Sequence, residues 1–70
     1  MEQVYKFEIH GMVFENVGTG GVHTASPTIP FITKAKTYEE ARTKALNFGQ
    51  DIVKGYNETG YTMFFRLVKG

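Results

Sequence analysis

The chain has 70 residues, including four tyrosines and six phenylalanines, and it has no cysteine. Its eight basic and seven acidic residues give a formal net charge of +1. The lack of cysteine excludes disulfides and thiolate metal sites, and the near-neutral charge argues against a strongly basic nucleic-acid binder or an acidic nucleic-acid mimic. No apolar run approaches the roughly 20 residues of a membrane span. We therefore expect one small cytoplasmic domain over residues 1–70, with no membrane contact.

Two short strands joined by a tight turn are predicted near the N-terminus. Residues 4–9 (VYKFEI) alternate apolar and polar side chains, as a half-buried strand does, and residues 12–17 (MVFENV) follow the dipeptide His10-Gly11. Glycine can take the positive φ of a two-residue hairpin turn at no steric cost. This turn would pair Ile9 with Met12 and Phe7 with Phe14 on the core side. The alternative is one long strand with a bulge at Gly11.

Residues 18–27 (GTGGVHTASP) are rich in glycine and polar residues, which predicts a flexible loop. Successive glycine N–H groups can face a phosphate, so Gly20, Gly21 and His23 are candidates for binding an anion or nucleotide. The segment lacks the lysine and the following helix of a P-loop, which favours a simple connection.

A third strand, a helix and a last strand are predicted in the rest of the chain. Residues 28–36 (TIPFITKAK) form the third strand, with Pro30 at an edge or a bulge. Thr37 followed by Glu40 is a capping-box pattern that starts a helix, which we expect to stop at Gly55 or Asn57. Its apolar stripe, at three- and four-residue steps, is Tyr38, Ala41, Ala45, Phe48 and Ile52. In the last strand, residues 61–69, the inward side chains are Tyr61, Met63, Phe65 and Leu67.

These elements predict an α+β fold: a small antiparallel sheet with one helix packed on one face, in the order β-β-β-α-β. A single helix covers only one face of a sheet, so the other face is either solvated or meets a partner. Besides Val4, Lys6, Val13 and Val17, the pattern assigns to this uncovered face five residues that we take as candidate partner-binding residues: Ile32, Lys34, Phe64, Arg66 and Val68.

The stretch PTIPFITKAKTYEEARTKAL, residues 27–46, resembles the HicB-like antitoxin domain. Pro27 and Pro30 keep the proline spacing of that family, Thr33 and Thr37 keep its threonine spacing, and residues 39–41 keep its helix start. The resemblance implies a small protein that docks on a toxin or another protein and blocks it.

Catalytic chemistry is not expected. His10 and His23 are the only histidines, and neither has another histidine or an aspartate within a few residues, so we expect no metal site and no cofactor. The helix start explains Glu39 and Glu40, and Ser26 has no neighbouring base. We interpret His10 as a turn residue and His23 as an exposed loop residue.

The predicted function is therefore non-catalytic binding. An apolar patch with a charged rim typically marks a partner surface, so we expect the uncovered face to dock on and block a host or toxin protein, as phage or mobile-element inhibitors do, or to form a homodimer. One alternative is a nucleic-acid-binding module that stacks bases on Phe64, which the low net charge disfavours. The other is a nucleotide or small-molecule binder that uses the glycine-rich segment.

Overall fold

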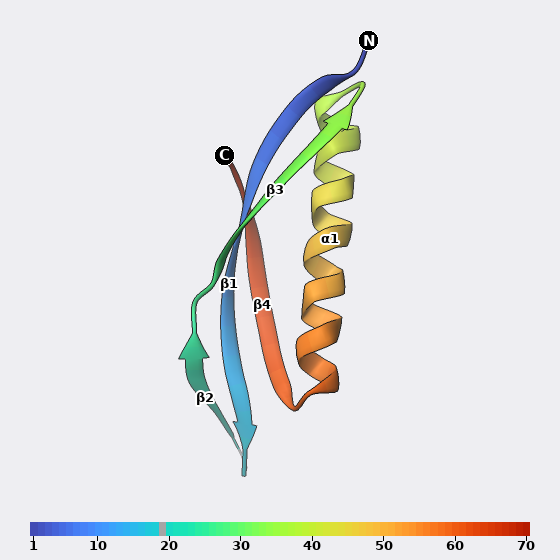
Figure 1. The fold of residues 1–70 in the computed structure, drawn as a ribbon. Helices are drawn as coiled ribbons and strands as arrows, with labels where there is room; N and C mark the ends of the chain where they lie inside the picture. Colours follow the sequence, from blue (N-terminus) through green and yellow to red (C-terminus); the bar gives the residue numbers. More distant parts are fainter. Residues whose placement is uncertain (19) are drawn as a thin grey trace.

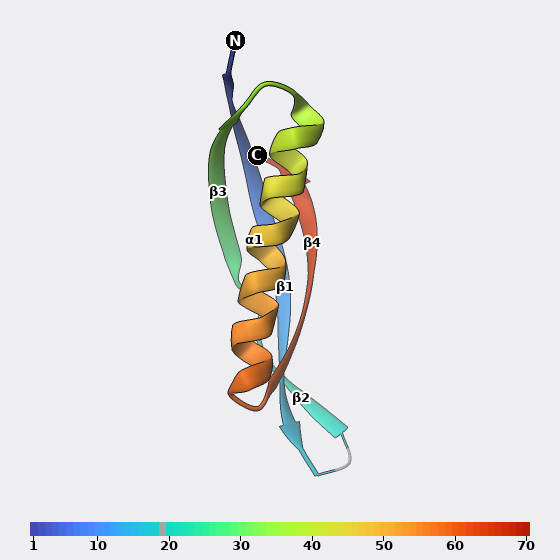
Figure 2. The ribbon, with the colours of Figure 1, turned by 90° about the vertical axis from the view of Figure 1, so that its right-hand side faces the viewer.

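The computed structural model describes residues 1–18 and 20–70, in which four strands and one helix occur (Figure 1). The elements are β1 (Gln3–Val17), β2 (Gly20–Ala25), β3 (Thr28–Ala35), α1 (Tyr38–Glu58) and β4 (Tyr61–Lys69). All strand pairs are antiparallel, and α1 lies along one face of the sheet (Figure 2). The predicted α+β class and the order β-β-β-α-β are confirmed. Within the described ranges, no helix is both long and apolar enough to cross a membrane.

Strand β1 is the centre of the sheet. Its residues Phe7–Glu15 pair with β4 along one edge. Along the opposite edge, Gln3–His10 pair with β3 and Val13–Val17 pair with β2. Strands β2 and β3 therefore follow each other along the same side of β1 and together form the return arm of one long hairpin.

The predicted hairpin at His10-Gly11 is wrong. Strand β1 runs straight through both residues, so the expected pairs of Ile9 with Met12 and Phe7 with Phe14 do not form. The alternative of one long strand holds, but the register shift lies between Val13 and Phe14 on the β2 side rather than at Gly11. Because side chains alternate along a continuous strand, the faces of residues 12–17 are the reverse of those predicted.

The predicted loop at residues 18–27 is wrong as well, because most of it is a strand. The chain reverses between Val17 and Gly20, which pair with each other, and Gly18 takes φ +58° there, as tight hairpins require. Thr19 lies outside the described residues. At the break between β2 and β3, the Gly11 N–H donates to the Pro27 carbonyl at 2.9 Å, so β1 remains bonded across the break.

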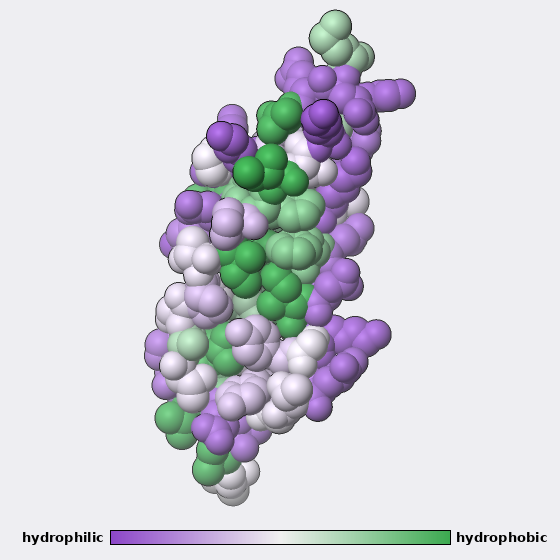
Figure 3. Space-filling model, in the orientation of Figure 1, coloured by the Kyte–Doolittle hydropathy of each residue, from purple (hydrophilic) through white to green (hydrophobic). Residues whose placement is uncertain are grey.

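The core lies between α1 and the helix-facing side of the sheet. The buried apolar residues form two clusters, Phe7 with Ala35, Ala41 and Ala45, and Ile9 with Val13 and Met63. Phe31 of β3 stacks on Phe48 of α1 with ring centroids 4.8 Å apart. Val13, which was predicted on the uncovered face, is 2% exposed, a direct result of the continuous β1. Figure 3 shows hydrophilic residues along the outer side of α1 and a hydrophobic band between α1 and the sheet.

Two glycines make room for core side chains. A Cβ on Gly49 would lie 2.6 Å from two carbons of the Phe65 ring, and a Cβ on Gly11 would lie 2.5 Å from the Met63 methyl. Gly49 therefore lets α1 approach β4 closely. Gly11 is needed for space within a strand and not for a turn.

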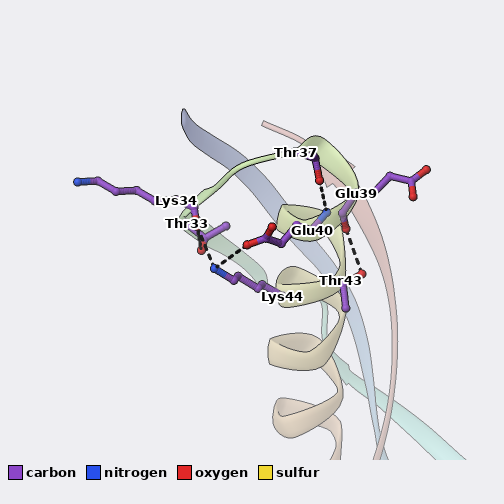
Figure 4. Close-up of polar contacts among 7 residues, drawn as sticks. All are labelled: Thr33, Lys34, Thr37, Glu39, Glu40, Thr43 and Lys44. Carbon is purple, nitrogen blue, oxygen red and sulfur yellow. Dashed lines mark hydrogen bonds and ion pairs between the residues drawn. The ribbon is translucent and has the colours of Figure 1, made fainter. Parts of the chain in front are cut away.

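The start of α1 has the predicted N-cap, but the Glu40 side chain pairs with Lys44 and does not return to Thr37 as in a capping box (Figure 4). Thr37 is the N-cap, in an extended conformation, and its hydroxyl oxygen accepts a hydrogen bond from the Glu40 N–H at 3.1 Å. The Lys44 ammonium donates to the Lys34 carbonyl at 3.0 Å and lies 3.7 Å from the Glu40 carboxylate. These contacts join the end of β3 to the first turns of the helix.

The predicted end of α1 at Gly55 or Asn57 is wrong, since the helix continues to Glu58 with Thr59 as its C-cap. Gly55 is exposed, and the helix runs past it because Tyr56 packs on the second core cluster and, edge to face, on Tyr61. The chain turns into β4 at Gly60, which has φ +89°.

We expect Thr37→Ala to lower the free energy of unfolding by about 1 kcal/mol, because it removes the acceptor for the Glu40 N–H. Chemical denaturation followed by circular dichroism measures this change. An unchanged midpoint would show that the hydroxyl does not stabilise the helix start.

We expect Gly49→Ala and Gly55→Ala to change stability in opposite directions. Alanine is favoured over glycine inside a helix by about 1 kcal/mol, and a Cβ at Gly55 meets nothing within 4 Å, so Gly55→Ala should stabilise by about that amount. At Gly49 the new methyl would push against the Phe65 ring, so that variant should be less stable than the unmodified protein. Thermal melts of both variants test the close helix–sheet contact, and stabilisation by both would contradict it.

Candidate binding face

The side of the sheet turned away from α1 is covered by no other described element, and we call it the open face. Since side chains alternate along each strand, its members follow from the strand register. They are Val4, Lys6, Glu8, His10, Met12, Phe14, Asn16, Gly21, His23, Thr28, Pro30, Ile32, Lys34, Thr62, Phe64, Arg66 and Val68. Figure 4 shows the Lys34 side chain pointing away from α1.

Three aromatic rings lie together on the open face. Phe14 of β1 has Phe64 of β4 on one side, with ring centroids 6.2 Å apart, and His23 of β2 on the other, at 5.4 Å. Met12 lies directly opposite Phe64 in the register. Phe64 is 62% exposed and Met12 is 49% exposed, so this group presents apolar surface to solvent. We call Met12, Phe14, His23 and Phe64 the phenylalanine cluster.

Polar side chains border the phenylalanine cluster. Arg66 lies opposite His10 across β1 and β4. The His10 imidazole is held 2.9 Å from the Glu8 carboxylate. The His23 imidazole lies 2.8 Å from the Ser26 hydroxyl, so the expectation that Ser26 has no neighbouring base is wrong. A depression of about 400 Å³ lies beside the cluster, lined by His10, Gly11, Met12, Ser26, Phe64, Phe65 and Arg66.

The charges of the strands on the open face are mainly positive. Lys6, Lys34 and Arg66 carry positive charge, and the negative charge comes from Glu8. Arg66 lies beside the phenylalanine cluster, and Lys6 and Lys34 lie near Ile32 at the other end of the face. The face therefore favours ligands that combine apolar groups with carboxylates or phosphates.

All five predicted partner-binding residues lie on the open face, but they do not form one patch. Ile32 pairs with Lys6, and Phe64 pairs with Met12, six residues further along β1. At the rise of a strand this separates Ile32 from Phe64 by about 20 Å. Ile32 and Lys34 therefore lie towards one end of the face, Phe64 and Arg66 towards the other, and Val68 between them, opposite Glu8.

The sequence reasoning missed half of the phenylalanine cluster. Met12 and Phe14 were assigned to the core because a turn at Gly11 would reverse their direction. The unbroken alternation of residues 4–14, read through Gly11 as one strand, would have placed both on the open face. His10 is not in a turn but in the middle of β1, and His23 is not in a loop but in β2, although it is exposed as expected.

The glycine-rich segment does not form a phosphate cradle in its described part. Gly20 and Gly21 are extended strand residues that pair with Val17 and Asn16. Successive N–H groups of a strand point in opposite directions, so they do not converge on one anion as they do in a nest. The loop candidates Gly20, Gly21 and His23 thus share a strand. Gly21 and His23 lie on the open face, and of the three only His23 contributes a side chain to it.

In residues 1–18 and 20–70, no group of three or more histidine, cysteine, aspartate or glutamate side chains is placed to hold a metal ion. Comparison with protein-family models, curated proteins and solved structures gives no match to this chain. The class of the protein therefore follows from its own architecture, which is a small α+β domain with one uncovered sheet face.

Adjacent residues Phe64 and Phe65 should respond differently to truncation. We expect Phe64→Ala to change the free energy of unfolding little, because most of that side chain is exposed. Phe65 packs against Gly49 and the second core cluster, so Phe65→Ala should destabilise by roughly 3–5 kcal/mol. Urea unfolding of both variants measures the difference. Similar losses in the free energy of unfolding would show that Phe64 and Phe65 do not lie on opposite faces of the sheet.

Proposed function

We propose that this protein is a non-catalytic binding protein that docks through its open face on a partner protein and blocks it. The observation that carries the proposal is the phenylalanine cluster, a group of apolar side chains with exposed surface towards one end of an uncovered sheet face. Exposed apolar groups with a polar rim mark protein contact sites, and a phenylalanine beside an arginine is a favourable centre for one.

The partner's surface follows from the chemistry of the face. It should offer an apolar segment to Phe64 and Met12 and acidic side chains to Arg66, Lys6 and Lys34. The blocking role is inferred from the resemblance of residues 27–46 to the HicB-like antitoxin domain. By analogy, the proposed protein belongs to the compact inhibitors of phages and mobile elements, and it acts in the reducing cytoplasm.

A nucleic-acid-binding module is the second candidate function. It is favoured by the number of rings on the open face, because the exposed Phe64 and His23 and the half-buried Phe14 together resemble a stacking platform for single-stranded bases. The three cations of the open face would contact phosphates. With three phosphate contacts, the logarithm of the affinity should fall against the logarithm of salt concentration with a slope of about −2.

The double variant Phe64→Ala/Arg66→Ala tests the proposed function. Immobilised wild-type protein should retain a specific protein from lysate of the source organism, and the double variant should not. Calorimetry with the purified partner should give a dissociation constant weaker by about 100-fold or more, as for loss of two hot-spot residues. The matched control is Arg42→Ala/Lys54→Ala, which removes two exposed residues from α1 and should bind normally.

Normal partner binding by the Phe64→Ala/Arg66→Ala variant would exclude the open face as the contact surface. Fluorescence anisotropy with single-stranded RNA and DNA distinguishes the second candidate. Oligonucleotide binding that weakens with salt and is lost in the same variant would show that the open face binds a nucleic acid and not a protein.

A further inference from the structure

The two edges of the sheet differ in how they are protected. The edge formed by β2 and β3 contains Pro30, a break at Ser26-Pro27 and a register shift opposite Val13 and Phe14. The other edge is β4, nine residues with the sequence YTMFFRLVK, without proline and with a regular register against β1. Within the described chain no strand lies beyond β4 (Figure 2). A long apolar edge without such protection is a template for another strand.

The hydrogen bonds at both ends of the β1–β4 pair show which groups of β4 are free. The Gly70 N–H donates to the Lys6 carbonyl at 3.0 Å, and the Asn16 N–H donates to the Gly60 carbonyl at 3.1 Å. Both bonds belong to the register that joins β1 and β4, so the even-numbered residues of β4 are those bonded to β1. The odd-numbered residues therefore point their N–H and C=O groups outward, away from the sheet.

We propose that two copies of this chain pair antiparallel through β4, with a two-fold axis at Phe65. This register engages the outward groups of all the odd-numbered residues and keeps the nine residues of both strands in contact. The pairs across the interface, each between one copy and the other, are Tyr61 with Lys69, Thr62 with Val68, Met63 with Leu67, Phe64 with Arg66, and Phe65 with Phe65.

Side-chain chemistry selects this register over its neighbours. It sets each Phe64 ring opposite the Arg66 guanidinium of the second copy, a favourable cation–π pair, and it leaves no like charges facing each other. Centring the axis on Arg66 would set the two guanidinium groups against each other. Centring it on Phe64 would leave the last two residues of each strand unpaired.

The shape of the single chain agrees with such pairing. Its accessible surface is 4913 Å², whereas a compact folded monomer of 7.9 kDa exposes about 4,400 Å². The axis is perpendicular to the sheet, so both helices lie on one side and both open faces on the other. The pairing uses backbone groups of β4 and does not depend on the proposed partner.

Cysteine cross-linking tests the register in a chain that has no cysteine of its own. In the double variant Thr62→Cys/Val68→Cys, each Cys of one copy faces a Cys of the other at a non-hydrogen-bonded site, where Cα atoms lie about 4.5 Å apart. The two positions in one chain are about 20 Å apart, so a disulfide must join two copies. We expect mild oxidation to convert this variant to covalent dimer.

The single variants Thr62→Cys and Val68→Cys are the matched controls. They should stay uncross-linked, because the single Cys of one chain lies about 20 Å from the same Cys of the other chain in the dimer. Cross-linking of a single variant would indicate a face-to-face dimer and overturn the proposal. Absence of cross-linking in the double variant would overturn it as well.

Two measurements on the unmodified protein complete the test. Sedimentation equilibrium should give twice the mass of the chain, and a monomer at all concentrations would overturn the proposal. Amide hydrogen exchange should show protection of Met63, Phe65 and Leu67 that rises with protein concentration, whereas Phe64 and Arg66 should be protected throughout by β1. Rapid exchange of the three odd-numbered amides at high concentration would show that β4 remains unpaired.

Discussion

The pairing of β1 along both of its edges is the constraint on which the rest of the structure depends. Every other strand is bonded to β1. A strand held on both sides cannot rotate, so the alternation of its side chains decides the two faces of the whole sheet. Phe7, Ile9 and Val13 then meet α1, and Met12 and Phe14 are turned to solvent.

The single helix limits how much of this sheet is covered. A helix of 21 residues is about 32 Å long, and the molecule extends over 51 Å. The hairpin formed by the end of β1 and by β2 therefore projects beyond α1 (Figure 1). Val17 and Val22, near its tip, are 51% and 55% exposed. The small core and the large exposed apolar surface thus have the same origin, which is one helix on a long sheet.

Local signals in the sequence predicted the elements that local interactions determine. The cap at Thr37 is set by residues within four positions of it, and the alternation of residues 61–69 correctly separated Phe64 from Phe65. The predicted order of elements matches because two errors cancel: the strands expected at residues 4–9 and 12–17 are one strand, β1, and the loop expected at residues 18–27 contains β2. The direction of the chain at Gly11 and the extended state of β2 depend on partners far along the sequence, and the same residues were compatible with a turn and a loop.

Glycine explains the first of these two errors. Gly18 and Gly60 are required for positive φ, whereas Gly11 and Gly49 are required because a side chain would collide with Met63 or Phe65. A glycine in a sequence does not by itself show whether the position needs a positive φ or has no space for a side chain. Interpreting Gly11 as a turn reversed residues 12–17, which moved Met12 and Phe14 into the expected core and made the candidate site incomplete.

Strand β4 contributes to both proposed interactions largely with different atoms, although the Phe64 and Arg66 side chains of the open face would also face each other across the pair. Its even-numbered side chains, Phe64 among them, belong to the open face, and the backbone groups of its odd-numbered residues form the free edge. Occupying the edge therefore does not cover the face. Pairing through β4 would instead bring two phenylalanine clusters onto one side of a continuous sheet, which doubles the apolar surface available to a partner. A symmetric or repeating partner would then bind the pair more tightly than a single chain, because its second contact would be intramolecular.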